Sequence, residues 1–149
     1  MDIYIAAVTA RLKGKSGAAA LAEDYLARAG RLGRVEPVTR GSEGEMLSWV
    51  DRLGGRTTPQ LILLDSRGKQ FTSEEFAEYL RRRRDSGTQA VVLAIGPADG
   101  WSPVARTRAE LLLSLGRMTL PHELARAVLT EQVYRALTIL AGHPYHCGH

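Results

Sequence analysis

Short apolar runs alternate along the chain with stretches in which apolar residues recur at helical spacing. Continuous apolar or β-branched runs of roughly four to eight residues are typical of buried strands, and apolar residues at i, i+3 and i+4 are typical of helices with one buried face. The pattern predicts strands at residues 2–8, 34–40, 60–65, 89–96 and 111–115. It predicts helices at residues 16–29, 42–53, 73–87 and 121–140.

This alternation predicts an α/β fold in which a mostly parallel sheet carries helices on both faces. The run at residues 60–65 is almost continuously apolar, so we expect a central strand there. Pro37 cannot donate to a central ladder, so the strand at 34–40 is expected near a sheet edge. In the first helix, Leu21, Tyr25 and Ala29 share one face, which we expect to be buried. Residues 1–149 show no linker or repeat, which predicts a single domain.

Composition narrows the class of protein only modestly. Hydrophobic residues make up 44% and charged residues 24%, as in ordinary soluble domains. No apolar run approaches the ~18 residues of a membrane span, and no basic segment precedes the first apolar run. We therefore expect no membrane partner and a cytoplasmic location. The net charge of +4, carried mostly by arginine, permits a nucleic-acid partner, but on composition alone a solvated basic surface is the better explanation.

The candidate ligand-binding residues lie in three loops that follow strand ends, the place where open α/β sheets bind ligands. They are the Leu64–Asp65 step, the stretch IGPADGWS (95–102) and the stretch SLGRMTLPHE (114–123). The common phosphate-binding signatures and the GxSxG nucleophile motif are missing from the sequence. Taken alone, the stretch at 95–102 is equally compatible with a plain turn, and the stretch at 114–123 is better explained as a connecting loop.

The last seven residues, HPYHCGH, hold three of the four histidines and the only cysteine. A zinc site needs a braced tetrahedral set, and the sequence offers no second CxxC or HxxxH pair to complete one. We therefore expect no dedicated metal, with a metal-responsive small protein as an alternative that rests on this tail alone. The run Arg81–Arg84 is either a solvated helix face or part of an RNA-binding surface, and Glu131 and Arg135 are spaced as a surface ion pair.

Read together, LLD (63–65), IGPADG (95–100) and SLGRMTLPHELARAVLTEQVYRALTILAGHPYH (114–146) resemble one family closely. It is the ribosomal large subunit methyltransferase H family of SPOUT-class enzymes, and the likeness extends over essentially the whole chain. The resemblance implies a C-terminal trefoil knot in the α/β fold and a homodimer. It implies transfer of a methyl group from S-adenosylmethionine to N3 of a pseudouridine in 23S rRNA of the assembled ribosome.

The resemblance also assigns roles to residues. It implies cofactor binding by two strand-end residues and a loop, namely Leu64, Gly96, Leu115, Gly116, Arg117, Met118, Thr119 and Leu120. Losing the N3 proton calls for a base of near-neutral pKa. The resemblance implies that the tail lies by the cofactor and helps to accept the nucleotide. We therefore expect Tyr145 to stack on or hydrogen-bond the pseudouridine, with His146 nearby as proton acceptor or orienter.

Two positions depart from the family pattern. Pro97 follows Gly96 where the family usually has a second glycine, which removes a backbone donor from that turn. Cys147 follows the PYH motif where the family commonly has an arginine, and a cysteine cannot grip a phosphate. The second departure supports an alternative, a catalytically inactive knotted paralogue that binds RNA or ribosomes.

Overall fold

The computed structural model describes residues 1–9 and 16–147 of the chain. Within these residues the strands are β1 (Asp2–Val8), β2 (Val35–Arg40), β3 (Gln60–Gln70), β4 (Ala90–Ile95) and β5 (Leu111–Ser114). The helices are α1 (Gly17–Ala29), α2 (Glu43–Arg52), α3 (Ser73–Asp85), α4 (Pro103–Arg108), α5 (His122–Ala141) and the short 3₁₀ helix η1 (Pro144–His146). Every predicted element is present, and apart from the end of β3 their ends agree with the prediction to within two residues.

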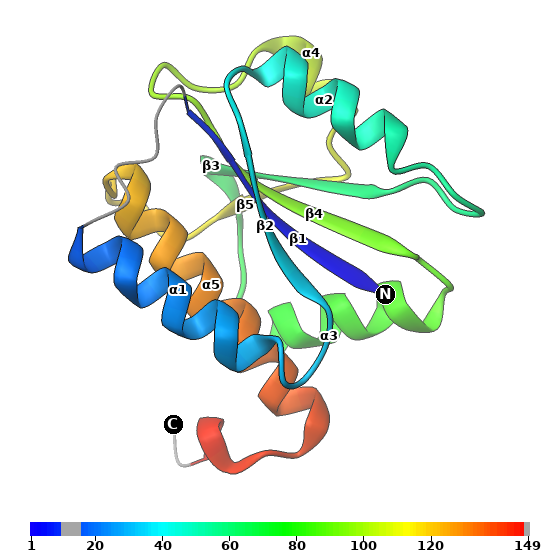
Figure 1. Ribbon diagram of the computed structural model, residues 1–149, viewed down its shortest axis with the longest axis vertical. Coiled ribbons are helices and arrows are strands. Elements are labelled where there is room, and N and C mark those ends of the chain that lie inside the picture. Colours follow the sequence, from blue (N-terminus) through cyan, green and yellow to red (C-terminus); the bar gives the residue numbers. More distant parts are fainter. Residues whose placement is uncertain (10–15, 148–149) are drawn as a thin grey trace.

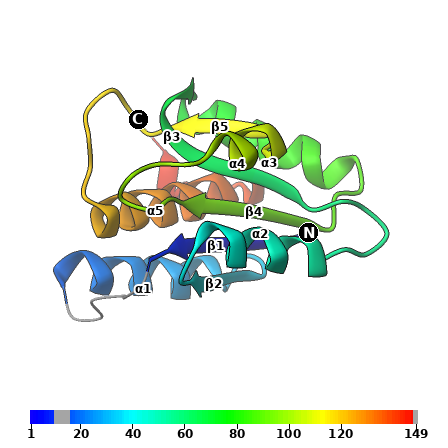
Figure 2. The same cartoon turned by 90° about the horizontal axis from the view of Figure 1, so that it is seen from above.

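The strands form one parallel sheet in the order β2–β1–β4–β3–β5, with the arrowheads pointing the same way in Figure 2. This arrangement confirms the predicted α/β class. β2, which contains Pro37, lies at one edge as predicted, and β3 lies between β4 and β5. Because every pairing is parallel, the carboxyl ends of the strands lie along the same edge of the sheet.

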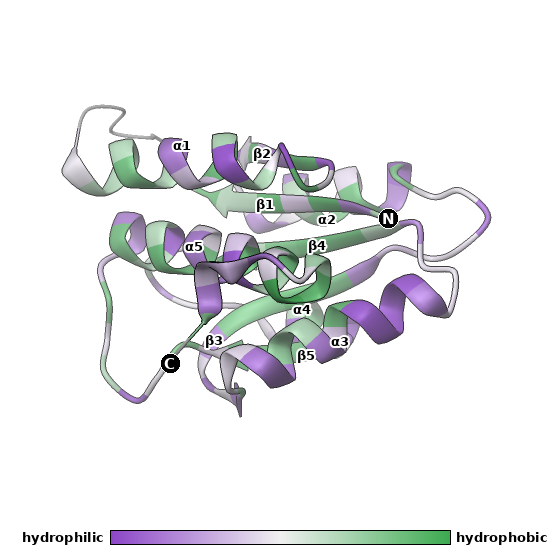
Figure 3. Cartoon of the chain, turned by 90° about the horizontal axis from the view of Figure 1, so that it is seen from below, coloured by the Kyte–Doolittle hydropathy of each residue, from purple (hydrophilic) through white to green (hydrophobic). Residues whose placement is uncertain are grey.

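Helices cover both faces of the sheet, as predicted (Figure 1). α1, α3 and α5 pack on one face, where Phe76 and Leu80 of α3 and Leu129 of α5 are buried against the strands. α2 and α4 pack on the other face, where Met46 and Val50 are fully buried. Figure 3 shows hydrophobic residues along β3 and β4 and a hydrophilic C-terminal half of α3. The sheet therefore separates two cores, as expected for a doubly covered parallel sheet.

Side-chain caps set where the helices begin. Ser16, Ser42 and Thr72 accept hydrogen bonds from backbone amides in the first turns of α1, α2 and α3. Each cap satisfies one of the amides that a helix N-terminus leaves unpaired. α5 ends at Gly142, whose φ of 69° is in the left-handed region that glycine adopts without strain.

The structure differs from the prediction in α1 and α4. Leu21 is 50% exposed and Tyr25 is half-buried, so of the predicted face only Ala29 is buried, and α1 also buries Ala19 and Ala22. These small side chains let α1 pack closely along α5. α4 was not predicted, because it has six residues, of which only Ala105 is buried, too few to form an apolar stripe.

β3 is longer than predicted because its second half has a polar sequence. Pairing with β5 breaks after Leu64 and resumes at Lys69, with a bulge between them. A Cβ atom at Gly68 would lie 2.5 Å from the backbone of Leu112, so only glycine fits this close approach of the two strands.

None of the described helices is both long and apolar enough to cross a membrane. The trefoil knot and the single-domain organisation of residues 1–149 stay predictions.

Candidate active site

The three strand-end loops come together in one pocket of about 980 Å³ at the carboxyl edge of the sheet. This volume is at the upper end of the usual range for small-molecule sites. The pocket is lined by seven of the eight residues implied to bind a cofactor, which are Leu64, Gly96, Leu115, Gly116, Met118, Thr119 and Leu120. Arg117 belongs to the same loop, but it is exposed and does not line the pocket.

The indole of Trp101 joins two of these loops. A Cβ atom on Gly96 would lie 2.7 Å from Cε2 of Trp101, so the ring occupies the space that a side chain at position 96 would need. The indole Nε1 donates a hydrogen bond to the carbonyl oxygen of Leu64 at 2.8 Å. No sequence pattern predicted this role, because a tryptophan after a glycine loop is equally compatible with ordinary core packing.

The loop from β5 to α5 bends at Gly116, whose φ of 145° strains any other residue. Its shape is held by Ser114, whose hydroxyl accepts from the Gly116 amide at 3.1 Å and donates to the Gly116 carbonyl at 2.9 Å. Met118 is 87% exposed at the tip of this loop. The loop therefore presents backbone groups and the apolar side chains of Leu115, Met118 and Leu120 to the pocket.

Charged groups line another part of the pocket, where the predicted strand-end residue Asp65 meets Arg106, which was not predicted to line it. The side chain of Asp65 is 6% exposed, and its Oδ2 lies 2.7 Å from Nη2 of Arg106. Oδ1 of Asp65 accepts a hydrogen bond from the backbone amide of Arg67 at 2.9 Å. The position of Asp65, directly after a buried apolar run, was the one available sequence signal for this site.

His122, the first residue of α5, also lines the pocket. Its Nε2 atom is buried, and no described residue forms a hydrogen bond with it. Burial lowers the pKa of His122 below its ordinary value of 6.5, and the backbone of Ile95 opposes this shift only in part. The imidazole is therefore neutral at neutral pH.

Tyr145 and His146 lie far from the pocket in the same chain. The pocket reaches the first residue of α5, whereas both tail residues follow its last turn, 20 residues on. At about 1.5 Å per residue the helix separates the two places by about 30 Å. The structure therefore gathers the implied cofactor residues but does not bring Tyr145 and His146 to them within one chain.

A polar network fixes the tail against α1, α3 and α5. Glu131 accepts from the hydroxyl of Tyr145 at 3.0 Å and forms an ion pair with Arg135 at 2.7 Å. The Arg135 side chain is 19% exposed and also lies 4.9 Å from the centre of the Tyr145 ring. Glu131 and Arg135 are therefore more than the surface pair that their spacing suggested.

Both ring nitrogens of His146 take part in this network. Arg135 donates to Nδ1 of His146 at 3.0 Å, and because arginine cannot accept, Nδ1 must be the acceptor. The proton is then on Nε2, which lies 2.6 Å from the Glu74 carboxylate. This hydrogen bond lowers the pKa of Glu74 below its ordinary value.

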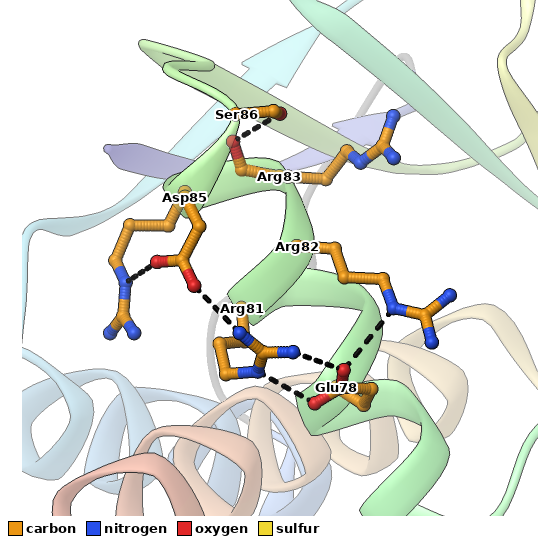
Figure 4. A network of polar contacts seen from close by, with 7 residues as sticks. Glu78, Arg81, Arg82, Arg83, Asp85 and Ser86 are labelled. Carbon is orange, nitrogen blue, oxygen red and sulfur yellow. Dashed lines mark hydrogen bonds and ion pairs between the residues drawn. The ribbon is translucent and has the colours of Figure 1, made fainter.

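The run Arg81–Arg84 is largely paired within its own helix (Figure 4). Three of its four arginines form ion pairs with Glu78 or Asp85. Hydrogen bonds from this run lower the pKa of Glu78 to about 2. Arg83 instead lies over the ring of Tyr79, 5.4 Å from its centre. Paired and exposed arginines at helical spacing fit the solvated-face alternative better than an RNA-binding surface.

No group of three or more metal-binding side chains occurs among residues 1–9 and 16–147. Cys147 is exposed and is not in a disulfide. His149, a further candidate ligand of the tail, lies outside the described residues.

Comparisons with known proteins show the family to which the chain belongs. A family model described as "Predicted SPOUT methyltransferase" matches residues 1–146. A protein of Koribacter versatilis, named ribosomal RNA large subunit methyltransferase H, is 53% identical over 129 residues, which cover 87% of this chain and 88% of that one. A protein of the same name from Cereibacter sphaeroides is 47% identical over 142 residues, covering 85% and 87%.

A solved structure shares the fold. It is the SpoU methyltransferase AviRb from Streptomyces viridochromogenes in complex with AdoMet, with a TM-score of 0.52 and 16% identity. The match covers 95% of this chain and 58% of that one, so this chain corresponds to little more than half of AviRb. With a family model that spans nearly its whole length and relatives at about half identity, the chain belongs to the SPOUT methyltransferase family.

Proposed function

We propose that the protein is an S-adenosylmethionine-dependent methyltransferase that acts on N3 of a pseudouridine in 23S rRNA of the assembled ribosome, and so works in the cytoplasm. The observation that carries this proposal is the single pocket formed by Leu64, Gly96 and the loop 115–120. The names of the relatives from Koribacter versatilis and Cereibacter sphaeroides support ribosomal RNA as the substrate.

The pocket fits S-adenosylmethionine in size and chemistry. Leu64, Leu115 and Leu120 offer apolar walls, and the loop residues that follow Gly116 present backbone groups that can read the edge of a purine. S-adenosylmethionine would supply an electrophilic methyl group on a sulfonium. The chain's own part is to orient that group and to shield it from water, which is the positioning role that dominates such transfers.

We further propose that the active site is completed by the tail of a second copy. Tyr145 and His146 lie one 20-residue helix away from the pocket of their own chain, so a lone copy carries only half of each site. A two-fold dimer that sets two copies of α5 in opposite directions would bring each tail to the other pocket. Leu21 on α1 and Leu124 on α5 support such an interface, because both remain exposed on neighbouring helices.

The tail network suits an acceptor site. Burial and hydrogen bonds to Tyr25 and Glu131 raise the pKa of Tyr145, so its hydroxyl stays protonated. It can donate to a nucleotide once its hydrogen bond to Glu131 opens. His146 has its Nδ1 lone pair occupied by Arg135. In this arrangement His146 orients the nucleotide, and it accepts the N3 proton only after its contact with Arg135 opens.

A methyl-transfer assay with labelled S-adenosylmethionine tests the function. The acceptors are ribosomes that lack this methyl group but retain their pseudouridines, with protein-free 23S rRNA as the matched control. Mass spectrometry of rRNA fragments should locate the label on one pseudouridine, and only in ribosomes. No transfer despite cofactor binding would favour the inactive paralogue, and Cys147→Arg then tests whether the missing tail arginine is the cause.

A further inference from the structure

The pocket contains a charged pair for which neither the family resemblance nor the proposed reaction has yet given a use. Asp65 at the end of β3 and Arg106 on α4 both line the pocket and lie 2.7 Å apart. The Asp65 side chain is almost fully buried, and that of Arg106 is 27% exposed, so the guanidinium faces both the carboxylate and the pocket.

Both members keep hydrogen-bonding capacity beyond their mutual contact. Arg106 uses Nη2 for Asp65 and directs Nε towards the Trp101 carbonyl at 3.4 Å, and no described residue accepts from its Nη1. Oδ2 of Asp65 accepts from Arg106, and a carboxylate oxygen can accept a second donor. The pair therefore offers one donor site and one acceptor site close together.

The charges that line the pocket are balanced. Two carboxylates, Asp65 and Asp99, accompany two guanidinium groups, Arg67 and Arg106, and His122 is neutral at neutral pH. A phosphate-binding site would show an excess of positive charge. A balanced set instead complements a zwitterion, which carries one carboxylate and one ammonium group.

We propose that Asp65 and Arg106 bind the amino-acid end of S-adenosylmethionine. Arg106 binds the α-carboxylate through its guanidinium, and Asp65 accepts from the α-ammonium group while holding Arg106 in place. The apolar walls at Leu64, Leu115 and Leu120 are then left for the adenosine. This inference rests on the proposed function, since it says which residues of the same pocket bind which part of the methyl donor.

A purely structural role for the pair makes a different prediction. Asp65 and Arg106 also tie α4 to the end of β3, so their loss lowers stability whatever they bind. Loss of stability weakens all ligands of the pocket alike. Loss of a specific contact weakens only ligands that carry the amino-acid group.

The test compares two ligands by isothermal titration calorimetry. S-adenosylhomocysteine carries the α-amino and α-carboxylate groups, and 5′-methylthioadenosine has the same adenosine and thioether without them. Arg106→Gln should weaken S-adenosylhomocysteine about tenfold or more, the usual worth of a charged hydrogen bond, and leave 5′-methylthioadenosine within about twofold. Asp65→Asn should act in the same direction, and Arg106→Lys, which keeps the charge, should recover part of the loss.

Arg108→Gln is the matched control, because Arg108 lies on the same helix but forms an ion pair with Asp51 outside the pocket. It should leave both affinities unchanged, and melting temperatures recorded for every variant separate folding from binding. Equal weakening of both ligands by Arg106→Gln, or no weakening, overturns the inference while the proposed function stands. A wild-type protein that binds neither ligand overturns both.

Discussion

The indole Nε1 of Trp101 donates to the carbonyl oxygen of Leu64 at 2.8 Å and so links the loop after β4 to the end of β3. The donor is a side chain and the acceptor is a backbone group, and both residues line the pocket. The two loops therefore keep their spacing through one hydrogen bond and the packing of one ring on Gly96.

Trp101→Phe should remove this hydrogen bond but keep an aromatic ring against Gly96. We expect a loss of about 1 kcal/mol in the free energy of unfolding, with weaker binding of S-adenosylhomocysteine, because the Leu64 carbonyl loses its donor. Urea unfolding and calorimetry measure the two effects. Trp49→Phe is the control, since no described residue accepts a hydrogen bond from the Trp49 indole, and equal losses in both variants would contradict the role given to Trp101.

Gly96→Ala should be destabilising because of its neighbour and not because of its backbone angle. A Cβ atom there would lie 2.7 Å from the Trp101 ring, and overpacking of this kind costs about 1–3 kcal/mol. Gly44→Ala makes the same chemical change in α2, where nothing lies within 4 Å of the added atom. It should be neutral or stabilising, by up to about 1 kcal/mol. Urea unfolding of the two variants side by side gives the comparison.

The stability of the protein should decline below pH 6.5 in part through His122. Burial lowers the pKa of His122 in the folded state, so the unfolded chain binds the proton first as the pH falls past 6.5, its ordinary value. The contribution is fully present above that pH and is lost between it and the lower folded pKa. His122→Gln should remove this part of the decline, as measured by urea unfolding from about pH 8 to about pH 5.

The difference in the free energy of unfolding between wild type and His122→Gln is the quantity to follow, because every other ionisable group is common to the two proteins. It should be constant above pH 6.5 and shift in favour of the variant below it. A difference that stays flat across the whole range would show that His122 is not buried as described.

Tyr145→Phe and His146→Ala should reduce methylation far more than stability. Tyr145→Phe removes a hydroxyl that donates to Glu131 at 3.0 Å, but it keeps the ring contact with Tyr134, so the loss of stability should be about 1 kcal/mol. The rate of single-turnover methylation measures the effect on function. An unchanged rate for His146→Ala would rule out both roles proposed for that side chain.

A site shared between two copies predicts recovery of activity on mixing two inactive variants. His146→Ala keeps an intact pocket, whereas Gly116→Val strains the bend of the loop but keeps an intact tail. Mixed dimers pair one intact pocket with one intact tail, so about a quarter of wild-type activity should return after co-refolding in equal amounts. No recovery in verified mixed dimers would place pocket and tail function within one chain.

The strands were readable from the sequence because continuous apolar runs have no stable position except between covered faces. All six residues of β4 are buried, and the same reasoning placed β2 at an edge through Pro37. Parallel topology then put the three strand-end loops along one edge. Seven cofactor residues implied by family resemblance line the pocket there.

What the sequence could not supply are pairings between distant residues. The Asp65–Arg106 ion pair joins the bulge in β3 to α4, neither of which has a periodic pattern, and the indole of Trp101 reaches the carbonyl of Leu64 from the loop after β4. The separation of Tyr145 from the pocket depends on the direction in which α5 leaves the sheet. Spacing along the chain gives the length of that helix but not its direction.

Because the 20 residues of α5 separate the tail from the pocket of its own chain, the rate of catalysis should depend on how much of the protein is dimeric. If the donor pocket and the acceptor tail of a working site belong to different copies, a dissociated chain has no complete site at any substrate concentration. Methylation per chain should then fall on dilution below the dimer dissociation constant, and the initial rate should become second order in protein. The cell would lose this modification abruptly, rather than in proportion, as the supply of the protein declines.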